Sequence, residues 1–138
     1  TFDWLMTIQD DNQGTLTMTQ EALQSADQLF SFYEKGSKKT VTDATALWLS
    51  RKSFDALKSG QLVKLNPGDA DVVFQRDDSY EGKRRLKALS NKYKLDPNVK
   101  TMLAQGKGGK YIIFLDDPSN PLIIEMFVGF KLTMEGMF

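Results

Sequence analysis

Short runs of aromatic and β-branched residues, separated by clusters of turn-forming residues, recur along this chain and constrain its fold more than any other feature. The strongest pair lies near the C-terminal end, where Tyr111–Leu115 and Leu122–Phe127 flank the turn-forming stretch Asp116–Pro121. Runs of this length are shorter than most helices, and their composition favours strands. Because the two runs are joined by a turn, we expect them to lie side by side in an antiparallel sheet.

The same pattern predicts strands through most of the sequence. The remaining expected strands are residues 2–9, 15–19, 29–33, 40–49, 61–65, 71–75 and, after a kink at Gly129, residues 130–134. The first two form a hairpin across the turn at residues 10–14, residues 35–39 form another turn, and residues 66–69 join the strands on either side of them. Residues 21–28 fit either a helical turn or a loop. Residues 83–94 are ambiguous between helix and strand, although Leu86, Leu89 and Tyr93 have helical spacing.

The clearest helix is expected from Ser50 to Gly60. The Ser50 hydroxyl can accept hydrogen bonds from N–H groups of the first turn. Phe54 and Leu57 share one face at helical spacing. Gly60 can adopt the left-handed conformation that ends many helices.

A second helix is predicted to begin at Asp96-Pro97. Aspartate is a favoured cap, and proline is tolerated at the first helical position. The helix would carry its apolar side chains inward and stop at Gly106, before a flexible glycine-rich loop. These inward residues are Val99, Met102 and Leu103.

These elements predict an α+β domain that is mostly β. We expect an antiparallel sheet that curls into an open or closed barrel, with one or two short helices at an end. The chain of 138 residues has the size and composition of a single domain over residues 1–138, with 41% hydrophobic and 26% charged residues. No apolar run approaches the ~20 residues that a membrane-spanning helix needs.

The chain contains no histidine and no cysteine. This removes the commonest general base at neutral pH, the thiol nucleophile, most zinc and copper ligands, and every disulfide. Chemistry would depend on carboxylates, lysines, hydroxyls or main-chain groups, and none of these shows a catalytic spacing. We therefore predict no cofactor and no metal site, and we assign no catalytic residue.

Opposite charges are concentrated in different parts of the chain, although the net charge is zero. Residues 1–34 contain acids and no Lys or Arg, whereas residues 82–110 are strongly basic. The two parts can pack together and cancel, or the basic stretch can form a patch that attracts polyanions, with Tyr80 and Tyr93 stacking on bases. The zero net charge and a pI near 6.2 argue against a dedicated nucleic-acid binder.

Two pairs of adjacent carboxylates, Asp77-Asp78 and Asp116-Asp117, are candidates for cation binding or for acid–base catalysis of glycoside hydrolysis. Neighbouring side chains of an extended chain point to opposite sides, so each pair alone is a poor bidentate site. Every residue of the stretch Asp116–Pro121 also favours a tight turn. We therefore expect turns at both places.

Two further motifs have a functional and a structural interpretation. The loop Gly106-Lys107-Gly108-Gly109-Lys110 suggests phosphate binding, but it precedes a strand and lacks the Ser or Thr of a P-loop. Trp4 and Trp48 can form a platform that stacks on carbohydrate or lines an apolar cavity. Because Trp48 stands between two leucines, we favour a core position for it.

Two stretches resemble a group of uncharacterised bacterial domains. The first is Trp48-Leu49-Ser50-Arg51 with Phe54, Leu57 and Gly60, and the second is Asp116–Met126. The group comes mostly from envelope or secreted proteins of Bacteroidetes-like genomes, so the resemblance implies a periplasmic or secreted setting. It implies no activity and no functional residues. Residues 84–94 form a strand in that group, whereas their pattern here is partly helical.

We therefore expect a non-enzymatic, β-rich binding or accessory domain of an exported bacterial protein. Its partner would be a small molecule, a glycan or another protein, bound in a barrel mouth or against a sheet face. One alternative is a glycosidase-like hydrolase that uses two carboxylates brought together by the fold. The other is a polyanion-binding module that uses the bases of residues 83–110.

Overall fold

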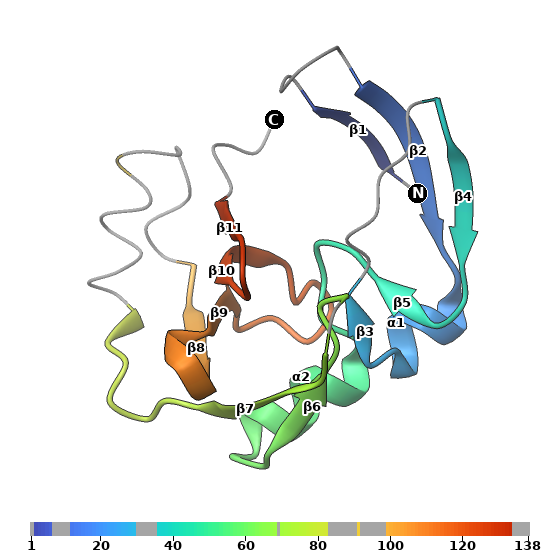
Figure 1. Cartoon of the computed structure of the whole chain (residues 1–138). Helices are drawn as coiled ribbons and strands as arrows, with labels where there is room; N and C mark the ends of the chain where they lie inside the picture. Colours follow the sequence, from blue (N-terminus) through green and yellow to red (C-terminus); the bar gives the residue numbers. More distant parts are fainter. Residues whose placement is uncertain are drawn as a thin grey trace.

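A computed structural model describes residues 2–6, 12–29, 36–68, 70–82, 91 and 99–133 (Figure 1). The elements in chain order are β1 (Phe2–Met6), β2 (Asn12–Met18), α1 (Gln20–Ser25), β3 (Gln28–Leu29), β4 (Lys38–Val41), β5 (Ala44–Thr45), α2 (Arg51–Lys58), β6 (Val63–Leu65), β7 (Val72–Arg76), β8 (Thr101–Gly106), the 3-10 turn η1 (Lys107–Gly109), β9 (Tyr111–Leu115), β10 (Ile123–Phe127) and β11 (Lys131–Thr133). Predictions for residues 7–11, 30–35, 83–90 and 92–98 lie outside the described residues. The chain is mostly β, as expected, with two short α-helices among the described residues.

A six-stranded antiparallel sheet contains the C-terminal half of the chain, in the order β11-β10-β9-β8-β7-β6. Each strand pairs with its neighbour in the sequence, which confirms the expected antiparallel sheet. The β9–β10 and β6–β7 pairs are the two that the turn residues predicted. Gly129 has a φ of +107° and lies at the bend before β11, where the kink was expected.

Both faces of this sheet are covered, which explains the continuous apolar runs in β9 and β10. Ile112 and Phe114 point to the side of α2, and Ile113 and Leu115 belong to a second cluster. α2 packs on β6 and β7, at the bottom of Figure 1. Alternate residues of one strand therefore contribute to two separate apolar clusters.

The prediction of a helix from Asp96 to Gly106 is wrong for residues 101–106, which form β8. β8 is an interior strand of the sheet, and it pairs with β7 on one side and with β9 on the other. These two ladders satisfy its backbone groups and outweigh the helical spacing of its apolar side chains. Gly106 ends a strand rather than a helix, and η1 makes the tight connection to β9.

The helix expected from Ser50 to Gly60 is confirmed as α2. The Ser50 hydroxyl accepts a hydrogen bond from the Ser53 amide at 3.2 Å, and both side chains are buried. Phe54 and Leu57 face the sheet and are fully buried. Gly60 follows with a φ of +83°, the left-handed conformation that a side chain would strain.

The N-terminal part pairs differently from the expected antiparallel sheet. β1 and β2 form the predicted antiparallel hairpin, but β2 also pairs with β4, and β3 with β5, in parallel. A parallel pair needs a crossover, which α1 and the residues after it supply. α1 settles the alternatives at residues 21–28 in favour of a helix, and Thr19 caps it by accepting a hydrogen bond from Ala22 at 3.3 Å.

The strand expected over residues 40–49 is broken into short pieces. β4 already begins at Lys38, within the turn predicted at residues 35–39, and it ends at Val41. β5 contains two residues, and residues 47–49 then pair with residues 121–123. The break allows residues 38–49 to pair with three sheets in succession.

Within the described residues, the hydrogen-bonded ladders do not close into a barrel. β6 and β11 are the two edges of the six-stranded sheet. Isolated bridges link Gln28 with Asn66 and Trp48 with Leu122, and so connect the short β3–β5 pair to both β6 and the start of β10. Neither described α-helix is long and apolar enough to cross a membrane.

Candidate functional site

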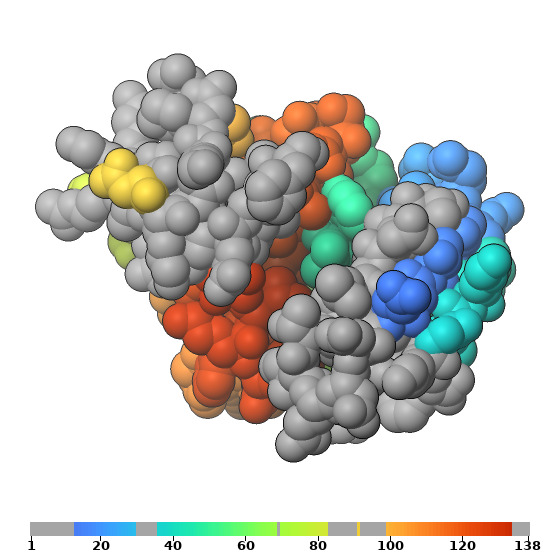
Figure 2. Space-filling view, turned by 90° about the horizontal axis from the view of Figure 1, so that it is seen from above, coloured from blue at the N-terminus to red at the C-terminus, as the bar shows by residue number. Residues whose placement is uncertain are grey.

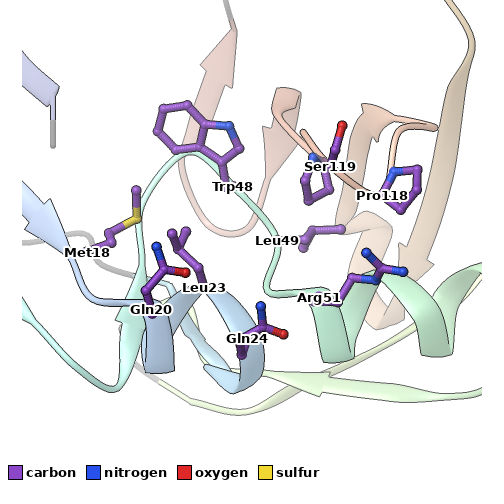
Figure 3. Close-up of a pocket in the computed structure, with 10 residues that line it drawn as sticks. Met18, Gln20, Leu23, Gln24, Trp48, Leu49, Arg51, Pro118 and Ser119 are labelled. Carbon is purple, nitrogen blue, oxygen red and sulfur yellow. The ribbon is translucent and has the colours of Figure 1, made fainter.

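A groove of about 440 Å³ lies where α1, the start of α2 and the loop before β10 meet (Figure 3). Figure 2 shows the surface around these segments from above, with the green residues before α2 between the blue N-terminal and the orange C-terminal parts. The groove has an apolar base and a rim of amide, hydroxyl and guanidinium groups. It is lined by Met18, Gln20, Leu23, Gln24, Trp48, Leu49, Arg51, Pro118, Ser119 and Pro121.

Trp48 reaches the groove because residues 47–49 pair with the C-terminal part of the chain. The Leu49 amide donates to the Pro121 carbonyl at 3.1 Å, and the Ile123 amide donates to the Leu47 carbonyl at 2.7 Å. The Trp48 side chain is half-buried and also packs on the apolar cluster around Ile113. Its position is therefore partly core, as predicted, and partly groove lining.

The indole of Trp48 is held in orientation by the opposite loop. Its Nε1–H donates to Asn120 Oδ1 at 2.8 Å. A tryptophan fixed by its only polar atom presents its π surface, rather than its N–H group, to a bound molecule. Trp4, the other tryptophan, lies in β1, where the structure describes the backbone alone.

The loop that holds Asn120 is a turn built around Asp117, as the sequence predicted. The Ser119 hydroxyl and amide both donate to Asp117 Oδ1, at 2.7 and 2.9 Å. The Ser119 hydroxyl, followed by its amide, lowers the pKa of Asp117 below the ordinary value for aspartate. The Asn120 amide also donates to the Asp117 carbonyl at 3.1 Å, so the turn forms a fixed wall of the groove.

The opposite wall is one face of α1. Gln20, Leu23 and Gln24 have the spacing that places side chains together on a helix surface, and all three line the groove. The two glutamine amides stand on either side of an apolar leucine (Figure 3). Each amide offers both a donor and an acceptor.

Arg51, the first residue of α2, is the charged residue among those that line the groove. Its Nε donates to both carboxylate oxygens of Asp55, each at 3.0 Å. Both side chains are about half-exposed, so this pair contributes little stability. Its clear effect is to fix the plane of the guanidinium group.

The other candidate carboxylates serve turns and ion pairs. Asp77 accepts from the hydroxyl and amide of Ser79, at 2.6 and 2.9 Å, which lowers its pKa. Asp78 accepts from Arg76 at 2.8 Å, and Asp116 lies 2.5 Å from Lys58 Nζ. The turn interpretation is thus correct for both pairs, and none of the four carboxylates lines the groove.

Glu125 is a buried carboxylate that the sequence did not single out. It lies in β10 with 7% of its side chain exposed, and the Tyr111 hydroxyl donates to it at 2.6 Å. Lys131 Nζ is 4.0 Å away on the adjacent strand. Glu125 therefore has the environment of a structural carboxylate between paired strands. The described residues contain no group of three acidic residues that could hold a metal ion.

The remaining candidates are only partly within the described residues. The glycine and lysine loop forms η1, a hairpin connection that has no helix after it to cradle a phosphate. The basic stretch lies mostly in residues 83–98, where the structure describes only residue 91. The Tyr80 hydroxyl is engaged with the Thr101 hydroxyl at 2.9 Å. Near this tyrosine, a second cavity of about 270 Å³ lies over β8 and β9.

Trp48 could be recognised as a candidate from the sequence, but the groove as a whole could not. The spacing of Gln20 and Gln24 on a short helix was a detectable signal, because residues four apart share a face. No local pattern could indicate that α1 faces the loop before β10, since that contact depends on tertiary pairing. No family model, no curated protein and no solved structure matches this chain.

Proposed function

We propose that this chain is a non-enzymatic binding domain that holds a glycan in the groove beside Trp48. The observation that carries the proposal is a tryptophan fixed through its N–H and facing two glutamine amides across an apolar base. A groove of about 440 Å³ lies within the range of small-ligand sites, roughly 300–1,000 Å³.

The chemistry of this lining matches that of a sugar ring. The C–H groups on one face of a pyranose carry partial positive charge and complement the negative π face of an indole. Sugar hydroxyls both donate and accept, and the amides of Gln20 and Gln24 and the hydroxyl of Ser119 do the same. No carboxylate lines the groove among the described residues, which favours binding without cleavage.

The hydrolase alternative has weaker support. A glycosidase needs one carboxyl group whose pKa is raised, so that it can act as an acid at neutral pH. The pKa values of Asp77 and Asp117 are instead lowered by the hydrogen bonds of Ser79 and Ser119. These two groups are ionised at neutral pH and cannot donate a proton there.

We further propose that the domain is an accessory part of an exported bacterial protein, in a periplasmic or secreted setting. The resemblance of its Trp48-Leu49-Ser50-Arg51 stretch to envelope domains supports this assignment. We also propose that the curved six-stranded sheet, with the bridges at Trp48 and Gln28, forms an open barrel. The groove then lies where the segment after β5 meets the start of β10.

Tryptophan fluorescence offers a direct test. A Trp4→Phe background leaves Trp48 as the single tryptophan, so a change in its emission on titration with neutral and acidic oligosaccharides reports the groove alone. Truncating an aromatic anchor commonly costs about 1.4–3 kcal/mol of binding, so Trp48→Ala should weaken affinity about tenfold or more.

Calorimetry measures the same titrations for variants that lack the fluorophore. Gln24→Ala should also weaken binding, whereas Gln61→Ala, an exposed amide outside the groove, should not. Saturable binding that is lost in Trp48→Ala and reduced in Gln24→Ala supports the proposal. Absence of binding to every glycan class, or binding unchanged in both variants, contradicts it.

A further inference from the structure

We infer that the glycan held by this groove is acidic, and that Arg51 binds the carboxylate of a uronic acid unit. This inference rests on the proposed function and specifies its ligand class. Arg51 and Trp48 line the same groove within one four-residue segment of the chain. A ligand with one ring stacked on Trp48 can therefore place the carboxylate of another of its sugar units near the guanidinium group.

The orientation of Arg51 is the first supporting observation. A planar guanidinium group has a side edge containing Nε and an end formed by its two terminal nitrogens. Asp55 accepts from Nε with both oxygens at 3.0 Å. Within the described part of the chain, the terminal nitrogens donate to no protein oxygen. The end that binds a carboxylate through two parallel hydrogen bonds is thus available.

The direction of the side chain is the second observation. Figure 3 shows the guanidinium of Arg51 pointing toward Pro118, another lining residue, at the side of the groove away from Trp48 and α1. The carboxylate that fixes it is on the next turn of α2, so Asp55 acts as a positioning residue. Because the orientation is set before binding, less side-chain entropy is lost when the ligand arrives.

The charge around the groove is the third observation. Among the described residues that line the groove, Arg51 is the single charged side chain, and the other polar groups are neutral. Asp117, in the loop wall, directs one carboxylate oxygen at the hydroxyl and amide of Ser119. Asp55 is itself paired with Arg51, so an acidic ligand meets one oriented cation and no unpaired described anion in the lining.

A uronic acid fits these features better than a neutral sugar or a peptide terminus. It combines a ring with an apolar face, hydroxyls for the amides of Gln20 and Gln24, and a carboxylate fixed to the ring. A peptide terminus would supply the carboxylate without the ring face and hydroxyls. Hydrogen bonds to a charged group contribute about 1.5–3 kcal/mol, which corresponds to at least tenfold in affinity.

The test compares each acid with its own methyl ester, which keeps the ring and removes the charge. The probes are the trisaccharides of galacturonate, glucuronate and mannuronate, each beside its ester and a neutral glucose trimer, titrated by calorimetry. We expect at least one acid to bind tenfold or more tightly than its ester. Arg51→Gln should remove that preference, and Arg51→Lys should restore part of it, because lysine keeps the charge but not the paired donors.

Lys52→Gln is the matched control, since it makes the same charge change at the next residue of α2, outside the groove lining. It should leave the preference for the acid unchanged. Asp55→Asn keeps the charge of Arg51 but loosens its orientation, and should reduce the preference by less than Arg51→Gln does.

Four outcomes overturn the inference. Equal binding of acid and ester refutes it and leaves the proposed glycan function intact. A preference for acid that persists in Arg51→Gln places the anion elsewhere, for example on the bases of residues 83–110. Binding of a peptide with a free carboxyl end, without binding of any sugar, replaces the ligand class. Absence of binding to acidic and neutral glycans alike refutes the proposed function as well.

Discussion

Replacing Phe54 with alanine should destabilise the whole domain, because this residue anchors α2 to the six-stranded sheet. Phe54 is 1% exposed and meets Phe114 of β9 edge-to-face, with ring centroids 6.1 Å apart and planes at 76°. Removal of a buried phenylalanine side chain costs about 3–5 kcal/mol, from lost transfer energy and the cavity that remains. The edge-to-face contact itself accounts for about 0.5–1.5 kcal/mol of such a loss.

Urea denaturation and thermal unfolding both measure this loss. For a domain of this size each kcal/mol corresponds to roughly 4 °C, so the midpoint should fall by about 10–20 °C. The matched control is Lys52→Ala, on the exposed face of the same helix, which should change the free energy of unfolding by less than about 0.5 kcal/mol. A double-mutant cycle of Phe54→Leu with Phe114→Leu isolates the energy of the ring pair.

A free-energy loss below about 1 kcal/mol for Phe54→Ala, with an unchanged denaturant slope, would refute the reasoning. It would mean that α2 does not pack on the sheet as described. A cycle that gives no coupling between the two rings would leave the burial argument standing but refute the edge-to-face contribution. Circular dichroism of each variant establishes whether the remaining strands are folded.

Three further variants test local features of the fold. Ser50→Ala removes the buried cap of α2 and should cost about 1 kcal/mol in urea denaturation, whereas a negligible change would refute the capping role. Gly106→Ala places a Cβ 2.8 Å from Val72 Cγ1, so thermal unfolding should reveal a loss of about 1–3 kcal/mol, and an unchanged midpoint would contradict the close approach. The hydroxyl and amide of Ser119 lower the pKa of Asp117 in the folded state. The ionised carboxylate therefore stabilises the fold above its unfolded-state pKa of about 3.9, and this stabilisation is lost as the pH falls through the folded-state pKa. The stability difference between the native chain and Asp117→Asn should therefore shrink as the pH falls below about 5, and a difference independent of pH would refute the turn bonds.

The parts of the fold that the sequence predicted correctly are those determined by neighbouring residues. α2 has its cap, its apolar face and its glycine stop within eleven consecutive residues, Ser50 to Gly60. The β9–β10 pair has its turn and both apolar runs in one continuous stretch. Such local signals remain valid because tertiary packing reinforces them.

The errors arose where distant pairing decides the structure. Val99, Met102 and Leu103 have helical spacing, but the last two lie in β8, which pairs with a strand on each side. The parallel pairing of β2 with β4 has no local signal, since it depends on the crossover through α1. In the same way, the sequence indicated Trp48 as a candidate. The other groove residues come from α1 and from the loop before β10, and the pairing of residues 47–49 with residues 121–123 brings this loop to Trp48.

The bond between Trp48 and Asn120 spans 72 positions of the chain, and it has a consequence for how the molecule is assembled during synthesis. When α1 and α2 have left the ribosome, the residues of two walls of the groove are present, but the loop that forms the third wall is not. The loop at residues 116–121 must emerge, and β10 must dock on residues 47–49, before the indole can be fixed. Contacts of such long sequence separation form late and slow the folding rate. A chain released before residue 123 would therefore contain most of the groove's residues and still lack the assembled groove.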